Sequence, residues 1–179
     1  MRWMCAALVA VASAGVASGQ VLWAGISAGT SWTWQGPTAP NTDFLHSSDM
    51  APSAFVAFPI NDDTLLRLRA ADLPYVPVFD GVAWPGKLRA YNVGVDYIFA
   101  DVFGQSVLSV GLGSYSLQLK AKTPPPGAEQ TRFGWYFGVG EWFQLTRRSR
   151  VTLELTMNRA EFVDHPVVLA ANLGLAVAF

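Results

Sequence analysis

Polar and apolar residues alternate with a period of two along the last stretch of the chain. From Val167 to Phe179 every second residue is apolar, and the intervening positions after Val168 are small or polar. Successive side chains of a β-strand point to opposite faces, whereas a helix repeats every three to four residues. The same alternation recurs in residues 89–99, 133–139 and 151–157. The pattern therefore predicts a protein built from strands.

Eight segments follow this pattern. They are Val21–Trp34, Ser53–Ile60, Thr64–Leu73, Lys87–Ala100, Ser106–Lys120, Arg132–Leu145, Arg150–Arg159 and Val167–Phe179. Two of them depart from strict alternation. In the fifth, the apolar positions change parity around Gly113, which suggests a β-bulge there. In the sixth, Glu141 falls in the apolar row, so we expect it either at a membrane interface or turned inward by a bulge at residues 138–140.

The connections between these strands alternate between long and short. Residues 35–52, 74–86 and 121–131 are long connections and 160–166 is intermediate, whereas 61–63, 101–105 and 146–149 are short. Transmembrane β-barrels have short periplasmic turns, longer external loops and an even number of strands. We therefore predict an all-β fold, an eight-stranded antiparallel up-and-down transmembrane barrel with both termini on the short-turn side.

Composition narrows the function classes. The chain has 179 residues, of which 51% are hydrophobic and 14% charged, with a formal net charge of −1. The balanced charge disfavours a nucleic-acid partner. No segment has about 18 solidly apolar residues, which disfavours a helical membrane protein.

The N-terminus has the three-part pattern of a secretory signal peptide. Arg2 precedes an apolar run, and small residues lead to a cleavage site after Gly19. We expect residues 1–19 to be removed and residues 20–179 to form the barrel domain; an uncleaved anchor helix is the alternative. Cys5 is the only cysteine, so the mature chain would lack disulfides, catalytic thiols and cysteine-bound metals.

Two segments carry a family resemblance. Residues 138–158 resemble the penultimate hairpin of the small outer-membrane barrels represented by OmpX and the OmpA transmembrane domain. Residues 173–179, which end in Phe179, are similar to the C-terminal signal by which the barrel-assembly machinery recognises such proteins. The resemblance implies insertion into the outer membrane of a Gram-negative-type cell, and it implies no particular activity because this fold serves many functions.

Four charged residues share the face opposite the apolar rows, and we expect them to form a lumen charge cluster at one level of the barrel. They are Arg67, Arg69, Asp96 and Glu154. An eight-stranded barrel is only just wide enough for side chains, so these groups should pair and block the passage. Aromatic residues near strand ends on the apolar face should form lipid-interface girdles. These are Trp32, Trp34, Tyr97, Phe99 and Trp135.

Other candidate sites have simpler explanations. His46 and Ser48 suggest a base and a nucleophile, as in lipid A deacylases of this barrel class, but they lie in a long loop without the surrounding motif. His46, Asp49, Asp164 and His165 would make a metal site only if separate loops met. The glycine pairs at 111/113 and 138/140 lack the strand-to-helix context of nucleotide loops, and we expect them to make room for bulky lumen side chains.

The sequence thus favours a non-enzymatic outer-membrane barrel without cofactor or metal, acting through its external loops or as a structural component. Expected partners are outer-membrane lipid, the barrel-assembly machinery and an extracellular ligand. Three alternatives remain: a lipid-modifying barrel enzyme using His46 and Ser48, a narrow porin-like channel, and a secreted lipocalin-like barrel. The last needs an apolar interior and a polar exterior, and the pattern here is the reverse.

Overall fold

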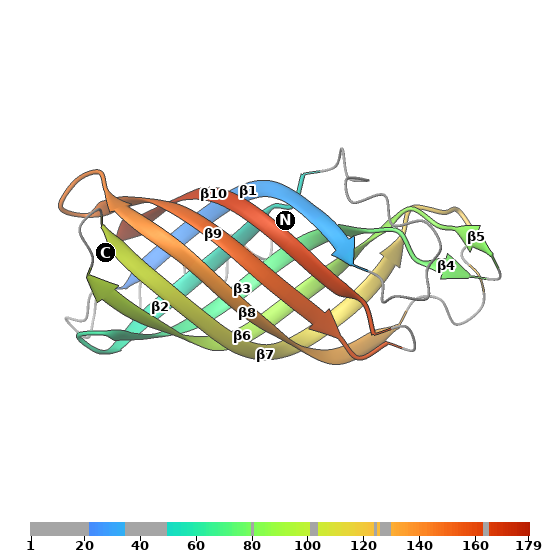
Figure 1. Ribbon diagram of the computed structural model, residues 1–179, viewed down its shortest axis with the longest axis horizontal. Coiled ribbons are helices and arrows are strands. Elements are labelled where there is room, and N and C mark those ends of the chain that lie inside the picture. Colours follow the sequence, from blue (N-terminus) through green and yellow to red (C-terminus); the bar gives the residue numbers. More distant parts are fainter. Residues whose placement is uncertain are drawn as a thin grey trace.

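The computed structural model describes residues 22–34, 50–79, 81–100, 104–123, 125, 130–162 and 165–179. Eight long strands form a closed antiparallel barrel (Figure 1). They are β1 (Trp23–Trp34), β2 (Ser53–Asn61), β3 (Thr64–Tyr75), β6 (Gly86–Ala100), β7 (Gln105–Leu119), β8 (Thr131–Gln144), β9 (Ser149–Ala160) and β10 (Val167–Ala178). Each predicted strand is confirmed with ends within two residues.

Every long strand pairs with its neighbour in the chain, and β1 pairs with β10 to close the barrel. The closing seam continues past the strands, because the backbones of Leu22 and Phe179 donate hydrogen bonds to each other at 3.2 and 2.8 Å. The described part of the chain contains no helix long and apolar enough to cross a membrane.

The two ends of the barrel differ. The short connections β2–β3, β6–β7 and β8–β9 lie at the end where the C-terminus lies, which we call the turn end (Figure 1). The strands that the longer connections join meet at the opposite end of the barrel, which we call the loop end. There the β3–β6 connection contains a small hairpin that the sequence pattern does not predict, formed by β4 (Val78–Phe79) and β5 (Val82–Ala83). Gly81 has a φ of 78° in its turn, a conformation that favours glycine.

Side chains alternate between an exposed apolar wall and a buried lumen. Along β6, for example, Tyr91, Val93 and Val95 are exposed, whereas Asn92, Gly94 and Asp96 are buried. Exposed apolar residues continue this wall around the barrel: Ile26, Leu66, Leu68, Leu108, Val110, Leu112, Phe137, Val139, Leu153, Leu155, Leu173 and Leu175. The outside is therefore apolar over the middle of the strands.

The predicted bulge at Gly113 is wrong. Strand β7 keeps one register with β6 and β8 through Gly113. The parity changes because Tyr115 and Leu117 face the buried lumen while Ser114 is exposed on the outside. What reverses is the polarity of the two faces: near the loop end the wall becomes polar and the lumen apolar.

Glu141 stays on the outer face near the turn end, and β8 has no bulge at residues 138–140. The Ser106 hydroxyl, opposite it on β7, donates a hydrogen bond to its carboxylate. The inward turn of Glu141 through a bulge is therefore wrong, and its place at a membrane interface stays a prediction. An irregularity occurs instead in β2, where the register shifts between Pro59 and Asn61.

Candidate functional site

The lumen contains an ion-pair centre at Arg67. Its Nε lies 2.6 Å from Oδ2 of Asp96 and its Nη1 lies 2.9 Å from Oε1 of Glu154. The Ser109 hydroxyl donates to the other oxygen of Asp96 at 2.7 Å. The three charged side chains are at most 8% exposed, so the barrel holds them away from bulk water. Isolated charges in such a place are costly, and this pairing compensates them.

Arg69 lies next along the same face but does not pair with a carboxylate among the described residues. Its guanidinium donates to Oδ1 of Asn158 at 3.2 Å and to Oγ1 of Thr156 at 3.4 Å. It also lies 5.3 Å from the ring centroid of Tyr136, within the range of a cation–π contact. The structure thus brings all four predicted cluster residues into the lumen, with Arg67 taking both carboxylates.

An apolar layer closes the lumen on the turn side of Arg67. It consists of Phe55, Ala57, Leu65, Ile98, Val107, Trp142 and Ala176, with Trp23 against them. The Arg67 guanidinium lies 4.3 Å from the centroid of Phe55, so the charged and apolar layers are in contact. The Trp23 and Trp142 ring centroids are 5.6 Å apart.

A second apolar layer fills the lumen at the loop end. It consists of Ala51, Ala71, Leu73, Tyr75, Leu88, Ala90, Tyr115, Leu117, Ala160, Val168 and Ala170. This layer was not predicted from the sequence, although the glycines were expected to face bulky lumen side chains. The shift of the apolar residues to the odd positions Tyr115 and Leu117 pointed to this layer. That shift was interpreted as a bulge.

Glycines make room for large lumen side chains at several positions. Of the four glycines named from the sequence, Gly111 faces Tyr136, Gly113 faces Asn92 and Gly140 faces Glu154, whereas Gly138 faces only the smaller Thr156 and Ser109. A Cβ at Gly111 would collide with the Tyr136 ring, and one at Gly94 would lie 2.5 Å from the Tyr136 hydroxyl. A Cβ at Gly134 would lie 2.6 Å from Tyr115. These distances are shorter than carbon contacts allow, so the tyrosines occupy the lumen because glycines face them.

Four of the five predicted interface aromatics lie on the outer face. Tyr97 and Phe99 are exposed on β6 toward the turn end, with ring centroids 6.1 Å apart. Trp32 and Trp135 are half-buried toward the loop end. The side chain of Trp34 lies outside the described residues. Phe179 is 52% exposed at the turn end.

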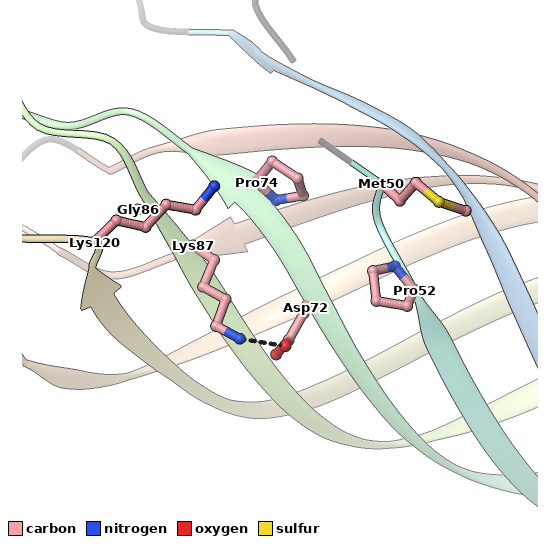
Figure 2. Close-up of a pocket in the computed structure, with 7 residues that line it drawn as sticks. All are labelled: Met50, Pro52, Asp72, Pro74, Gly86, Lys87 and Lys120. Carbon is pink, nitrogen blue, oxygen red and sulfur yellow. Dashed lines mark hydrogen bonds and ion pairs between the residues drawn. The ribbon is translucent and has the colours of Figure 1, made fainter. Parts of the chain in front are cut away.

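Charged residues replace apolar ones where the wall reaches the loop end. Asp72 accepts from Nζ of Lys87 at 2.6 Å and from Nε of Arg89 at 2.9 Å. A pocket of about 290 Å³ lies beside this cluster (Figure 2). Met50, Pro52, Asp72, Pro74, Gly86, Lys87 and Lys120 line it, and we call it the rim pocket. No residue of this pocket was singled out from the sequence.

His46 and Ser48, the candidate base and nucleophile of the enzyme alternative, lie outside the described residues. So do Asp49 and Asp164 of the conceivable metal site. His165 is described, and its Nδ1 lies 2.8 Å from the carboxylate of Glu161.

Comparisons with known proteins identify the fold. No protein-family model matches the chain, and no curated protein matches its sequence. Among solved structures, neisserial surface protein A superposes with a TM-score of 0.67 at 13% identity, covering 88% of this chain and 97% of the other. The attachment invasion locus protein Ail of Yersinia pestis, solved with the heparin analogue sucrose octasulfate, gives 0.61 at 12% identity, covering 89% and 99%.

The N-terminal β-barrel domain of Pseudomonas aeruginosa OprF is also similar, with a TM-score of 0.56 at 15% identity over 88% of this chain and 97% of that domain. At these identities the likeness concerns the fold alone. The architecture of this chain is that of the small eight-stranded outer-membrane β-barrels.

Proposed function

We propose that this protein is a non-enzymatic, integral outer-membrane barrel with a closed lumen, acting as a structural or surface-interaction component through its loop end. The observation that carries the proposal is the combination of an apolar outer wall with a lumen filled by charged and apolar layers. A closed barrel satisfies its backbone hydrogen bonds internally, which a sheet in lipid requires. A filled lumen leaves the loop end as the surface available to partners.

Outward aromatic residues support the membrane placement. Tyr97, Phe99 and Phe179 lie toward the turn end, and Trp32 and Trp135 toward the loop end. Aromatic girdles at both interfaces are typical of transmembrane barrels. The expected partners are outer-membrane lipid around the wall, the barrel-assembly machinery through the terminal Phe179, and an extracellular ligand at the loops. Export would depend on residues 1–19, which lie outside the described residues.

The experiment is to express the full chain in a Gram-negative host and fractionate the envelope. We expect the protein in the outer-membrane fraction, with faster electrophoretic migration before heating than after, because a folded barrel resists detergent. Recovery of a folded monomer from the soluble fraction would contradict the proposal. The alternative of a lipid-modifying enzyme rests on His46 and Ser48, and no described residue favours it.

A further inference from the structure

The short connection between β8 and β9, at the turn end of the barrel, carries a cluster of arginines. Arg147 and Arg148 are exposed there, and Arg150 follows at the start of β9. The guanidinium of Arg150 lies 4.8 Å from the ring centroid of Trp23, beside the turn-end apolar layer. Among the described residues no carboxylate, the one at Phe179 included, forms an ion pair with these arginines. We call residues 145–148 the arginine turn.

The backbone of the arginine turn is held on both sides. The amides of Leu145 and Thr146 donate to the Ser149 carbonyl at 3.0 and 3.1 Å. The Thr146 and Ser149 hydroxyls are hydrogen-bonded at 2.6 Å, and the Arg148 amide donates to Oγ1 of Thr146 at 3.2 Å. On the neighbouring strand β10, the Ala178 amide donates to the Arg148 carbonyl at 2.8 Å. The two exposed guanidinium groups therefore extend from a fixed backbone, which lowers the conformational entropy lost when they bind a ligand.

The apolar outer wall reaches directly to the arginine turn. Phe143 and Leu145 continue the outward row of β8 and are 37% and 62% exposed, and Phe179, after the adjacent strand β10, is 52% exposed. Arginines at such a boundary can keep their methylene groups on apolar surface while the guanidinium reaches the polar side. Free cations immediately beyond an exposed apolar surface suit an amphiphile with an anionic head and a hydrocarbon chain.

The other side of the turn end has the opposite charge. The strand order of the closed barrel puts the β2–β3 turn across the ring from the β8–β9 turn. That turn carries Asp62 and Asp63, both exposed. An anionic head group would be attracted to the arginine turn and repelled by the β2–β3 turn, so the charge pattern favours one position and not a uniform shell of lipid.

We propose that the arginine turn binds the phosphate of an anionic phospholipid, with an acyl chain along the wall at Phe143 and Leu145. The inference rests on the proposed function, which puts the wall in the outer membrane; the turn end then lies at its inner leaflet. Guanidinium groups make paired, charge-assisted hydrogen bonds to phosphate oxygens. A soluble phosphate compound would use the same contacts without the apolar wall, and the experiment separates these two sources.

The test measures lipid retention by the folded, purified protein with native mass spectrometry, using equal amounts of phosphatidylglycerol and phosphatidylethanolamine with the same acyl chains. Phosphatidylglycerol has a net negative charge, whereas the ammonium group of phosphatidylethanolamine offsets its phosphate. We expect the wild-type protein to retain phosphatidylglycerol preferentially. The variant Arg147→Gln/Arg148→Gln should reduce this preference by about fivefold or more, since charge-assisted contacts to phosphate are lost. Heat-dependent migration of the variant checks that it folds.

The charge-matched control is Lys122→Gln/Arg132→Gln, which removes two exposed positive charges at the loop end and should keep the preference. Glycerol phosphate, which has an anionic head without acyl chains, should not displace bound phosphatidylglycerol. Displacement would indicate a site for a soluble phosphate compound and would overturn the lipid site.

Equal losses of preference in the two double variants would also overturn the site, because net charge alone would then explain the retention. An unchanged preference in the arginine variant would overturn it as well and would favour an acidic periplasmic macromolecule as the partner of this turn. A wild-type protein that shows no heat-dependent migration would instead contradict the proposed function, so the two failures are distinguishable.

Discussion

Arg67 lies between two carboxylates in the lumen, at 2.6 Å from Asp96 and 2.9 Å from Glu154. Breaking a buried pair by removing one partner costs more than the pair contributes, because the remaining charge stays buried without compensation. The contact with Phe55 adds a cation–π attraction but does not neutralise the charge. The stability of the barrel should therefore depend strongly on each acid.

Glu154→Ala should lower the free energy of unfolding by about 3–5 kcal/mol. The measurement is urea-induced unfolding of the protein reconstituted in lipid bilayers, followed by tryptophan fluorescence. Glu161→Ala is the matched control, because Glu161 is half-exposed and contacts Arg159 at 3.3 Å. Its loss should cost about 0–1 kcal/mol, as for surface ion pairs. Equal effects of the two variants would show that the lumen pair is hydrated.

The sequence pattern correctly predicted that the four charged residues of the lumen cluster face the lumen. This was possible because the alternation along a strand alone decides which face a residue is on. It did not predict the partners of Arg69, which are Asn158 and Thr156. The long Arg69 side chain reaches across the lumen to β9. Which residues of β9 lie at its level along the barrel axis depends on the stagger between the strands. That stagger arises from the register of all eight strands together, and no local pattern contains it.

At the level of elements, pairing between β1 and β2 is short. It runs from Trp23–Ala57 to Ser27–Ser53, and one further hydrogen bond joins the Ala51 amide to the Gly29 carbonyl at 2.9 Å. By contrast, β6 and β7 pair over their full length. Beyond Gly29, the edge of β1 facing β2 has no paired strand among the described residues, and Ser31 reaches the Pro74 carbonyl on β3 at 3.3 Å.

We expect amide hydrogen exchange in bilayers to be faster at Ser31 and Thr33 than at Gly25 and Ser27. All four residues have the parity that directs their amides toward β2, but only the latter two have a partner there. Residue-resolved exchange by solid-state NMR measures the difference. Equal protection at all four amides would mean that another part of the chain completes this edge.

The last strand offers a second test at this scale. Phe179 is exposed at the turn end, next to Leu22. If it is the assembly signal, Phe179→Asp should reduce the amount of folded protein in the outer membrane several-fold. Phe143→Asp is the control, since Phe143 is also an exposed aromatic on the outer face toward the turn end. Similar losses in both variants would attribute the effect to charge on the wall rather than to recognition of the terminus.

The pattern of eight strands was predictable because each strand has a long stretch with one apolar and one polar face. The polarity reversal in β7 was not, because Tyr115 and Leu117 turn their apolar surface into the lumen beyond the apolar wall. A local pattern cannot distinguish this reversal from a bulge, since both change the parity of the apolar residues. The short hairpin β4–β5 was missed because two-residue strands have no period to detect.

For the whole molecule, the arrangement of the lumen in layers decides whether it conducts. The charged layer at Arg67 lies between two apolar layers, one around Trp142 and Phe55 and one around Tyr115 and Leu73. Each layer alone opposes the passage of ions. In the charged layer Arg67 is paired with two carboxylates. The apolar layers present mainly carbon atoms, which cannot replace the hydration shell of an ion. The layers are independent barriers in series.

We therefore expect the folded protein to show no large, stable single-channel currents in planar lipid bilayers at either polarity. A variant with the turn-end layer trimmed, Phe55→Ala/Trp142→Ala, should also remain closed, because the ion pairs of Arg67 and the loop-end layer remain. The variant must first show heat-dependent migration, so that unfolded protein is not mistaken for a closed barrel. Currents from the trimmed variant alone would assign the barrier to the turn-end layer. Large, stable currents from the wild-type protein would contradict a closed lumen, and the protein would then act as a narrow porin-like channel.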